Sequence, residues 1–120
     1  MNSLKSIPIG VHGALEVLAA PLLIVAPFVL GFGAVAGALS IALGILLIGL
    51  AVSIYGEGDR ASVPLTAHAG FDQVLAAVTI VVGIALLFAG TPAAGIFMVG
   101  FGAAHMALSA STRYSRPLGA

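Results

Sequence analysis

The run Ser6-Ile7-Pro8-Ile9-Gly10-Val11-His12-Gly13-Ala14-Leu15-Glu16 returns 56 positions later as Ser62-Val63-Pro64-Leu65-Thr66-Ala67-His68-Ala69-Gly70-Phe71-Asp72. Both copies place a Ser and a Pro ahead of a His, and a carboxylate four residues after the His. Residues four apart lie on one face of an α-helix. Each copy leads directly into a long apolar segment, so the sequence predicts that a His and a carboxylate enter a membrane together, twice.

The composition is that of a membrane domain. The chain has 120 residues, of which 61% are hydrophobic and 7% charged, whereas about 25% of the residues of a soluble domain are charged. A helix that spans a bilayer needs about 20 apolar residues. Four such runs fit the chain, at about residues 8–30, 33–55, 65–89 and 92–112. We therefore expect an all-α polytopic membrane protein with four transmembrane helices.

The repeat extends beyond the opening motif. A shift of 56 residues also aligns Phe32 with Phe88, Gly44 with Gly100, and Ser53 with Ser109. Self-similarity at a fixed spacing indicates repeated structural units. We expect a single membrane domain over residues 1–120, with one two-helix repeat at about 5–60 and a second at about 61–116. Two spans per unit preserve its orientation, so the repeats should form a four-helix bundle about an axis normal to the membrane.

Local signals predict where the helices start and pack. Ser6 and Ser62 are candidate N-caps, with Pro8 and Pro64 in the first turn. Small residues spaced four apart let helices approach closely in lipid. The second span offers such a face, and the fourth offers two candidates. These predicted faces comprise Ala36, Ser40 and Gly44 in the second span, and Gly100 with Ala104, and Ala103 with Ala107 and Ser111, in the fourth.

The basic residues predict the topology. Lys5, Arg60, Arg113 and Arg116 all fall on one side of a four-span protein, and the two opposite loops carry no charge. Positive residues are retained on the cytoplasmic side. We therefore expect an inner or plasma membrane protein with both termini in the cytoplasm. Tyr55 and Tyr114 would then lie in the cytoplasmic headgroup layer.

Five ionisable residues fall within the predicted spans. His12 and Glu16 share one face of the first helix, and His68 and Asp72 share one face of the third. His105 enters from the same side in the fourth span, at a similar depth. A carboxylate in the middle of a membrane helix costs about 2.5–3.5 kcal/mol and needs partners. The five residues therefore form a candidate polar cluster in the cytoplasmic half of the bundle.

Three interpretations of this cluster stay open. The first is structural: His12 pairs with Asp72 and His68 with Glu16, or each His pairs within its own helix, and the pairs fix helix packing. The second is a proton relay, since imidazoles and buried carboxylates exchange protons near neutral pH. The third is a haem or a transition metal held by the histidines and carboxylates. The His-x3-Glu spacing matches neither the Glu-x-x-His pair of di-iron bundles nor His-Glu-x-x-His.

Nothing in the sequence indicates catalysis. Ser40, Ser53 and Ser109 resemble interface hydroxyls, and no Gly-x-Ser-x-Gly elbow is present. There is no cysteine for thiolate ligation, and a net charge of zero gives no reason to expect nucleic acid. Our leading hypothesis is a non-enzymatic structural or accessory subunit without a cofactor, surrounded by the lipid bilayer, that associates with copies of itself or with another membrane protein. The alternative is a proton-coupled transporter of small solutes with Glu16 and Asp72 as proton carriers.

The run Ala26-Pro27-Phe28-Val29-Leu30-Gly31-Phe32 resembles the SPW-repeat family of bacterial and archaeal membrane proteins. That family repeats a two-helix unit whose first helix ends in Ser-Pro-Trp, followed by apolar residues and Gly-Phe. Here Ala26 and Phe28 replace the Ser and the Trp, and the second hairpin has Val82-Gly83-Ile84 instead. The resemblance implies a small helical membrane protein with no established activity.

The length, the four spans and Glu16 in the first span are also similar to the small multidrug-resistance transporters. In those transporters a glutamate of the first span is functional, and Glu16 would be the matching residue. This chain lacks their tryptophan and their mid-span tyrosine. Its one-sided Lys and Arg placement also differs from the weak charge bias of their dual-topology members.

Overall fold

The computed structural model describes residues 5–55 and 64–115. This part of the chain contains four long helices: α1 (Ile9–Leu30), α2 (Ala34–Val52), α3 (Leu65–Phe88) and α4 (Pro92–Ala110). A short 3-10 helix, η1 (Ser53–Tyr55), extends α2, and two-residue strands β1 (Ile7–Pro8) and β2 (Thr112–Arg113) flank the bundle. Each long helix, with η1 counted as part of the second, is long and apolar enough to cross a membrane. The predicted all-α polytopic fold is confirmed.

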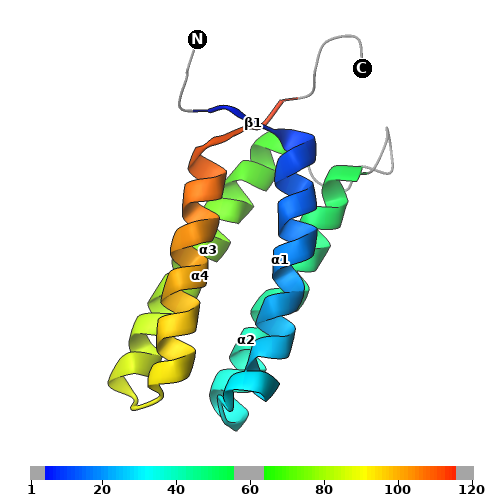
Figure 1. The fold of residues 1–120 in the computed structure, drawn as a ribbon. Helices are drawn as coiled ribbons and strands as arrows, with labels where there is room; N and C mark the ends of the chain where they lie inside the picture. The colour runs from blue at the N-terminus through cyan, green and yellow to red at the C-terminus, as the bar shows by residue number, and fades with distance from the viewer. Residues whose placement is uncertain (1–4, 56–63, 116–120) are drawn as a thin grey trace.

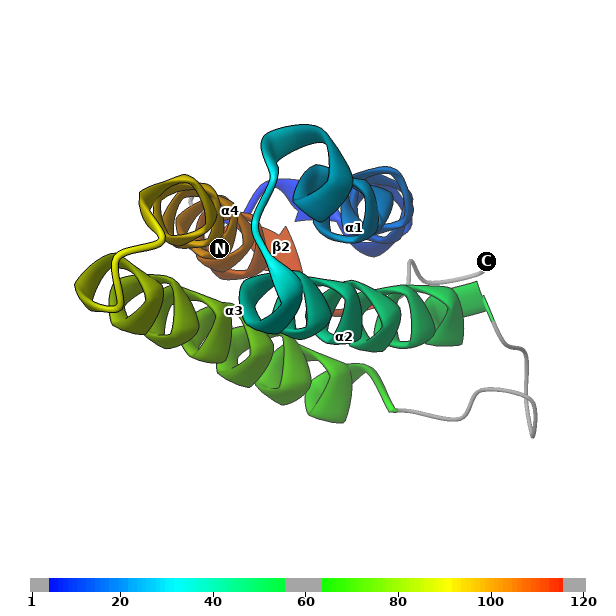
Figure 2. The same ribbon diagram turned by 90° about the horizontal axis from the view of Figure 1, so that it is seen from below.

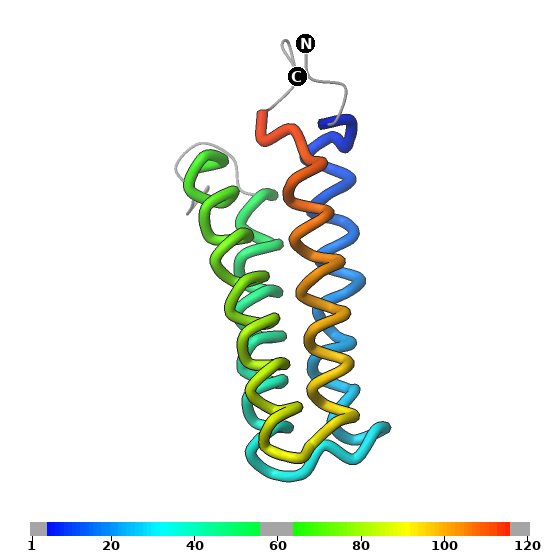
Figure 3. Tube along the Cα trace, turned by 90° about the vertical axis from the view of Figure 1, so that its left-hand side faces the viewer, coloured from blue at the N-terminus to red at the C-terminus, as the bar shows by residue number. Residues whose placement is uncertain are grey.

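The helices form two antiparallel hairpins, α1 with α2 and α3 with α4 (Figure 1). Contacts within each hairpin are dense, whereas those of α1 with α4 and of α2 with α3 are sparser. Figure 2 shows the two hairpins side by side along the bundle. The turn between α1 and α2 and the turn between α3 and α4 lie at one end of the bundle, and β1 and β2 lie at the other (Figure 3). The turns use left-handed backbone at Gly31, Gly33 and Gly90, with φ of 65°, 82° and 84°, which glycine adopts without steric cost.

The outer surface of the bundle is apolar. Leu18, Phe28 and Phe88 are 73%, 76% and 90% exposed on the protein itself. A soluble protein rarely leaves such contiguous apolar surface in water, whereas lipid tails solvate it. With four spanning helices, this surface makes the chain a multi-pass membrane protein.

The first helix starts differently from the prediction. Ser6 is exposed and does not cap α1, because Pro8 is the N-cap residue and no side chain caps the helix. Pro8 precedes the first turn rather than lying within it, and Pro64 holds the same place before α3. The other candidate cap, Ser62, lies outside the described residues. The chain before α1 is instead fixed by the Ile7 N–H, which donates to Ser111 O at 3.0 Å.

This contact belongs to a feature that the sequence did not predict. β1 and β2 pair in parallel, with Ile7 opposite Thr112 and Pro8 opposite Arg113. The pairing joins the segment before α1 to the segment after α4 over one end of the bundle (Figure 1). It also fixes the position of the residues that follow α4.

The predicted small-residue face of α2 is confirmed. Ala36 and Ser40 are buried, and the Ser40 hydroxyl donates to Leu23 O of α1 at 2.5 Å. A methyl group added at Gly44 would lie 3.1 Å from Ala20 O. The α1 and α2 backbones therefore approach closely along this face.

The predicted faces of α4 do not pack within the bundle. Gly100, Ala103, Ala104 and Ala107 are exposed, and Ser111, which follows the helix, is half-buried. The face that packs inward instead carries Gly95, Met98, Gly102, His105 and Ser109. Small residues occur all around this helix, so their spacing alone did not select the face. The face that packs inward is instead the one that buries His105 away from lipid.

Candidate functional site

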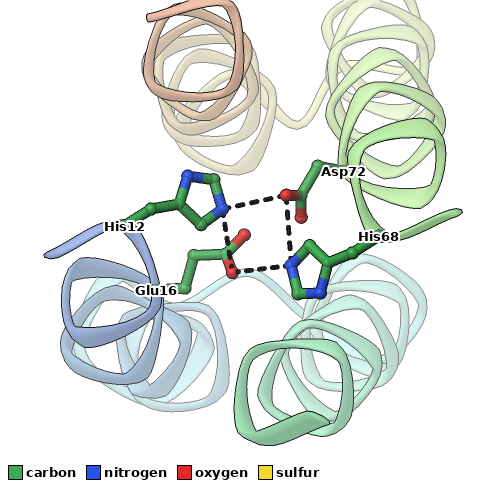
Figure 4. Close-up of side chains that lie close together, drawn as sticks. All are labelled: His12, Glu16, His68 and Asp72. Carbon is green, nitrogen blue, oxygen red and sulfur yellow. Dashed lines mark hydrogen bonds and ion pairs between the residues drawn. The ribbon is translucent and has the colours of Figure 1, made fainter. Parts of the chain in front are cut away.

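The functional side chains lie on the inward-facing rows of α1 and α3. Glu16 follows His12 by four residues, and Asp72 follows His68 by the same spacing, so each pair projects from one helix face. Both rows continue as small buried residues, Ala20 in α1 and Ala76 in α3. The four polar side chains therefore face each other across the interface between the hairpins (Figure 4).

The structure brings together all five residues of the predicted cluster. Burial is complete for His12, His68 and Asp72, at 0% exposure, and nearly so for Glu16 at 1% and His105 at 6%. The cluster lies in the half of the bundle that carries β1 and β2, because His12 and His68 are near the starts of α1 and α3 and His105 is near the end of α4. Lipid, which cannot hydrogen-bond to these groups, is thereby kept away from them.

Two imidazoles and two carboxylates alternate around a closed ring (Figure 4). His12 Nε2 lies 2.9 Å from Asp72 Oδ2 and 3.2 Å from Glu16 Oε1. His68 Nε2 lies 3.2 Å from the same Asp72 oxygen and 3.4 Å from the same Glu16 oxygen. Both predicted pairings, across the interface and within each helix, are therefore present at once.

His105 contacts the opposite edges of the same carboxylates. Its Nε2 lies 2.9 Å from Glu16 Oε2 and 3.3 Å from Asp72 Oδ1. Each carboxylate therefore directs one oxygen to both His12 and His68 and the other oxygen to His105. All three histidines present Nε2 to the cluster.

Hydroxyl groups hold the outer nitrogens of the two ring histidines. His12 Nδ1 lies 2.7 Å from Thr112 Oγ1, and His68 Nδ1 lies 3.4 Å from Ser53 Oγ. The single hydrogen of each hydroxyl is already used, because Thr112 donates to Leu108 O and Ser53 donates to Leu50 O, both at 2.6 Å. The hydroxyls can therefore only accept from the imidazoles.

This hydrogen-bond network assigns the tautomers of both histidines. His12 and His68 must carry a hydrogen on Nδ1 in order to donate outward. In a neutral imidazole, Nε2 then bears a lone pair, and both lone pairs face carboxylate oxygens. Such an arrangement is repulsive unless a cation, either a proton or a metal ion, lies among the four groups. An outer hydrogen bond that fixes the tautomer is also the usual support of a metal-binding histidine.

Tyr114 is a site residue that sequence reasoning placed elsewhere. It was expected in the headgroup layer, yet its hydroxyl donates to Asp72 Oδ2 at 2.7 Å, and Ser109 donates to the Tyr114 oxygen at 2.8 Å. Its ring packs edge-on against His12, with centroids 5.2 Å apart. Burial, together with the Asp72 carboxylate, raises the pKa of Tyr114 above its ordinary value of about 10.

Sequence analysis also missed the part that Thr112 and Ser53 play in the site. One signal was available for Ser53, which the repeat aligns with Ser109, and both of these serines contact the cluster or its partners. No sequence signal marks Thr112 or Tyr114. Both reach the site because β2 returns over the end of the bundle.

The electrostatic balance depends on the histidines. The described residues include two basic side chains outside the cluster, Lys5 and Arg113, and both are exposed. In this part of the chain, every ion pair of Glu16 and Asp72 is with a histidine. A buried charge is strongly destabilising unless it is paired. If the histidines are neutral, the two buried carboxylates carry a charge of −2 that needs a partner. One divalent ion would balance this charge.

The spacing of the ring atoms also fits a metal. The four candidate ligand atoms of His12, Glu16, His68 and Asp72 all lie within 4.8 Å of one another. Bonds of about 2.0–2.2 Å in a tetrahedral arrangement place neighbouring ligand atoms roughly 3.3–3.6 Å apart. The four contacts between neighbouring members of the ring, at 2.9–3.4 Å, are close to this range.

Comparison of the chain with protein-family models, with characterised proteins and with solved structures gives no match.

Proposed function

We propose that this is a metal-binding membrane protein that holds a divalent transition metal ion on His12, Glu16, His68 and Asp72. The observation that carries the proposal is that Nε2 of His12 and Nε2 of His68 each lie 2.9–3.4 Å from the same two carboxylate oxygens. Imidazole and carboxylate ligands without thiolate suit zinc, copper, iron, nickel or manganese. A haem is not part of the proposal, because the carboxylates fill the space between the two imidazoles and leave no room for a porphyrin.

A metal ion accounts for the ring better than protons do. If His12 and His68 were imidazolium ions, their Nε2–H groups would donate across the interface to Asp72 Oδ2 at 2.9 Å and to Glu16 Oε1 at 3.4 Å. The His68 contact is long for a hydrogen bond, and the two contacts within the helices, both 3.2 Å, would have no hydrogen between their atoms. One central ion satisfies all four groups together.

The ion would also join the two hairpins. Two ligands come from α1 and two from α3, and the contacts between hairpins are sparser than those within them. Binding of a metal to the folded state stabilises that state by mass action. The proposal thus retains a non-enzymatic structural role for the cluster, with the metal as the link, in a small accessory subunit of the membrane.

Metal analysis tests this proposal. Protein purified in detergent, stripped with chelator and dialysed against Zn²⁺ should retain the ion, whereas the double variant Glu16→Gln, Asp72→Asn should not. Ser40→Ala is the matched control, since Ser40 is equally buried but bonds to Leu23 O at a separate place between α1 and α2. Equal metal content in the wild type and the double variant would exclude the site.

A second candidate function is proton-coupled transport, and one contact favours it. The Tyr114 hydroxyl links Ser109 to Asp72, so a chain of hydrogen bonds leads from the half-buried Tyr114 into the cluster. Uptake of a solute into proteoliposomes, driven by a pH gradient and abolished by Tyr114→Phe, would support this function. A metal-loaded protein that transports nothing would favour the first proposal.

For the topology, we propose that both termini are cytoplasmic in the inner or plasma membrane. Lys5 and Arg113 lie at the same end of the bundle in the structure, and positive residues favour the cytoplasmic side. The other two residues of that argument, Arg60 and Arg116, lie outside the described residues. Reporter fusions at the C-terminus and in the turn near Gly90 should report opposite sides, with the C-terminus inside. Membership of the SPW-repeat family and the two-repeat organisation remain proposals from sequence.

A further inference from the structure

The two carboxylates of the cluster present oxygens on two sides. Glu16 Oε1 and Asp72 Oδ2 face His12 and His68, whereas Glu16 Oε2 and Asp72 Oδ1 face His105. Resting on the metal site proposed above, we propose that the cluster is a two-metal centre. In it, the second divalent ion binds His105 Nε2, Glu16 Oε2 and Asp72 Oδ1, and the two carboxylates bridge the ions.

The distances from His105 to the two carboxylates are close to those between neighbouring ligands of one metal ion. Its Nε2 lies 2.9 Å from Glu16 Oε2 and 3.3 Å from Asp72 Oδ1, comparable to the roughly 3.3–3.6 Å between neighbouring ligands of a tetrahedral ion. A carboxylate that coordinates through both oxygens holds two ions at the spacing of about 3.5–4 Å that is usual in two-metal sites. Glu16 and Asp72 both have their two oxygens placed in this way. A single ion bound at the ring would use only one oxygen of each carboxylate.

A cavity lies beside the cluster on the side of His105. His12, His68 and Asp72 are 0% exposed, whereas His105 is 6% exposed. A cavity of about 280 Å³ between α1 and α4 reaches both Glu16 and His105. Its remaining walls are apolar side chains, among them Leu15, Ala19, Leu22, Phe101 and Leu108. The cavity therefore lies next to the second position.

Ligand count and charge distinguish the two positions. The ring offers four protein ligands, as closed structural metal sites do, whereas the His105 position offers three, as sites that keep a place for water or substrate do. Two divalent ions also exceed the charge of two carboxylates. The open place would therefore favour an anionic ligand such as hydroxide.

Cobalt titration of chelator-treated protein in detergent tests this inference. The wild type should bind two Co²⁺ per chain by optical titration, and His105→Gln should bind one. The Gln side chain keeps a hydrogen-bond donor near Glu16 while removing the imidazole ligand. Electron paramagnetic resonance of the two-cobalt form should give less than twice the intensity of the one-cobalt form, because bridged ions couple magnetically.

Each outcome decides between specific claims. One ion in both proteins would overturn the second position and leave the ring site standing, whereas no ion in the wild type would overturn both. Two ions in His105→Gln, two uncoupled ions in the wild type, or no ion in a His105→Gln protein that keeps wild-type helix content would also overturn the second position. Ser40→Ala, which is remote from both positions, should bind two ions like the wild type.

Discussion

His12 Nδ1 donates to Thr112 Oγ1 across 2.7 Å, and this bond connects the start of the first helix to the residue that opens β2. The Thr112 hydroxyl has no hydrogen left for His12, since it donates to Leu108 O. The contact therefore keeps the hydrogen of a neutral His12 on Nδ1, so that Nε2, which faces the cluster, carries a lone pair. The Thr112 hydroxyl, which lies outside the cluster, thus sets the tautomer of His12 inside it.

Replacing Thr112 by Val should therefore weaken metal binding. The isosteric change removes the acceptor of the His12 Nδ1–H and frees the imidazole to change tautomer. Loss of such an outer partner typically costs about 10–100-fold in affinity. Competition titration with a coloured chelator measures the change. Thr79→Val is the matched control, because the Thr79 hydroxyl bonds within its own helix to Leu75 O, and Thr112→Ser should restore most of the affinity.

Removing a ring imidazole should have a larger effect. His68→Ala deletes one of the four proposed ligands and leaves both carboxylates without one of their partners. We expect its metal affinity to fall by more than the roughly 100-fold upper range for an outer partner. The same competition titration measures it. An unchanged affinity in a variant that keeps wild-type helix content would remove His68 from the site.

Tyr114 should make the folded protein sensitive to alkaline pH. Its pKa is raised in the folded state by burial and by Asp72, so the folded protein holds this proton more tightly than the unfolded chain, whose phenol titrates near about 10. The stabilisation is complete below that pH and declines as the pH rises above it. Tyr114→Phe carries no such proton, so its melting temperature in detergent should fall less than that of the wild type between pH 9 and about 11. Parallel decline of both proteins would contradict this assignment.

The close approach of α3 and α4 should tolerate no methyl group at Gly102. A Cβ there would lie 2.9 Å from Ala76 O and 3.0 Å from Ile80 N, both backbone atoms. Overpacking of this kind costs about 1–3 kcal/mol. Gly100→Ala is the control two residues away, where an added Cβ meets nothing within 4 Å. Unfolding in mixed detergent should show Gly102→Ala destabilised and Gly100→Ala as stable as the wild type or more so.

The sequence predicted the parts of the structure that lipid itself dictates. Four apolar runs become four helical spans because hydrocarbon offers no hydrogen-bond partners, and a helix pairs its own backbone N–H and C=O groups. His12, Glu16, His68, Asp72 and His105 meet because each is too costly to expose to lipid, and the interior is the place left for them. Their convergence therefore followed from hydropathy and helical spacing alone.

The remaining features depend on contacts that have no local signal. The packing face of α4 follows from His105 rather than from the spacing of Gly100 and Ala104, and small residues on every side of this helix concealed it. The roles of Thr112 and Tyr114 depend on how the chain returns after α4 to pair with Ile7 and Pro8. Two-residue strands leave no pattern in a sequence, so the residues that support the histidines could not be predicted.

The most direct test of the account is X-ray absorption spectroscopy at the zinc edge on protein that has been stripped, reloaded with Zn²⁺ and washed in detergent. The account predicts bound zinc with nitrogen and oxygen ligands at about 2.0–2.2 Å and the multiple-scattering signature of imidazole. Bound zinc should be lost from the Glu16→Gln, Asp72→Asn variant. A folded wild-type protein that takes up no zinc, copper, iron, nickel or manganese would contradict the claim that this cluster is a metal centre.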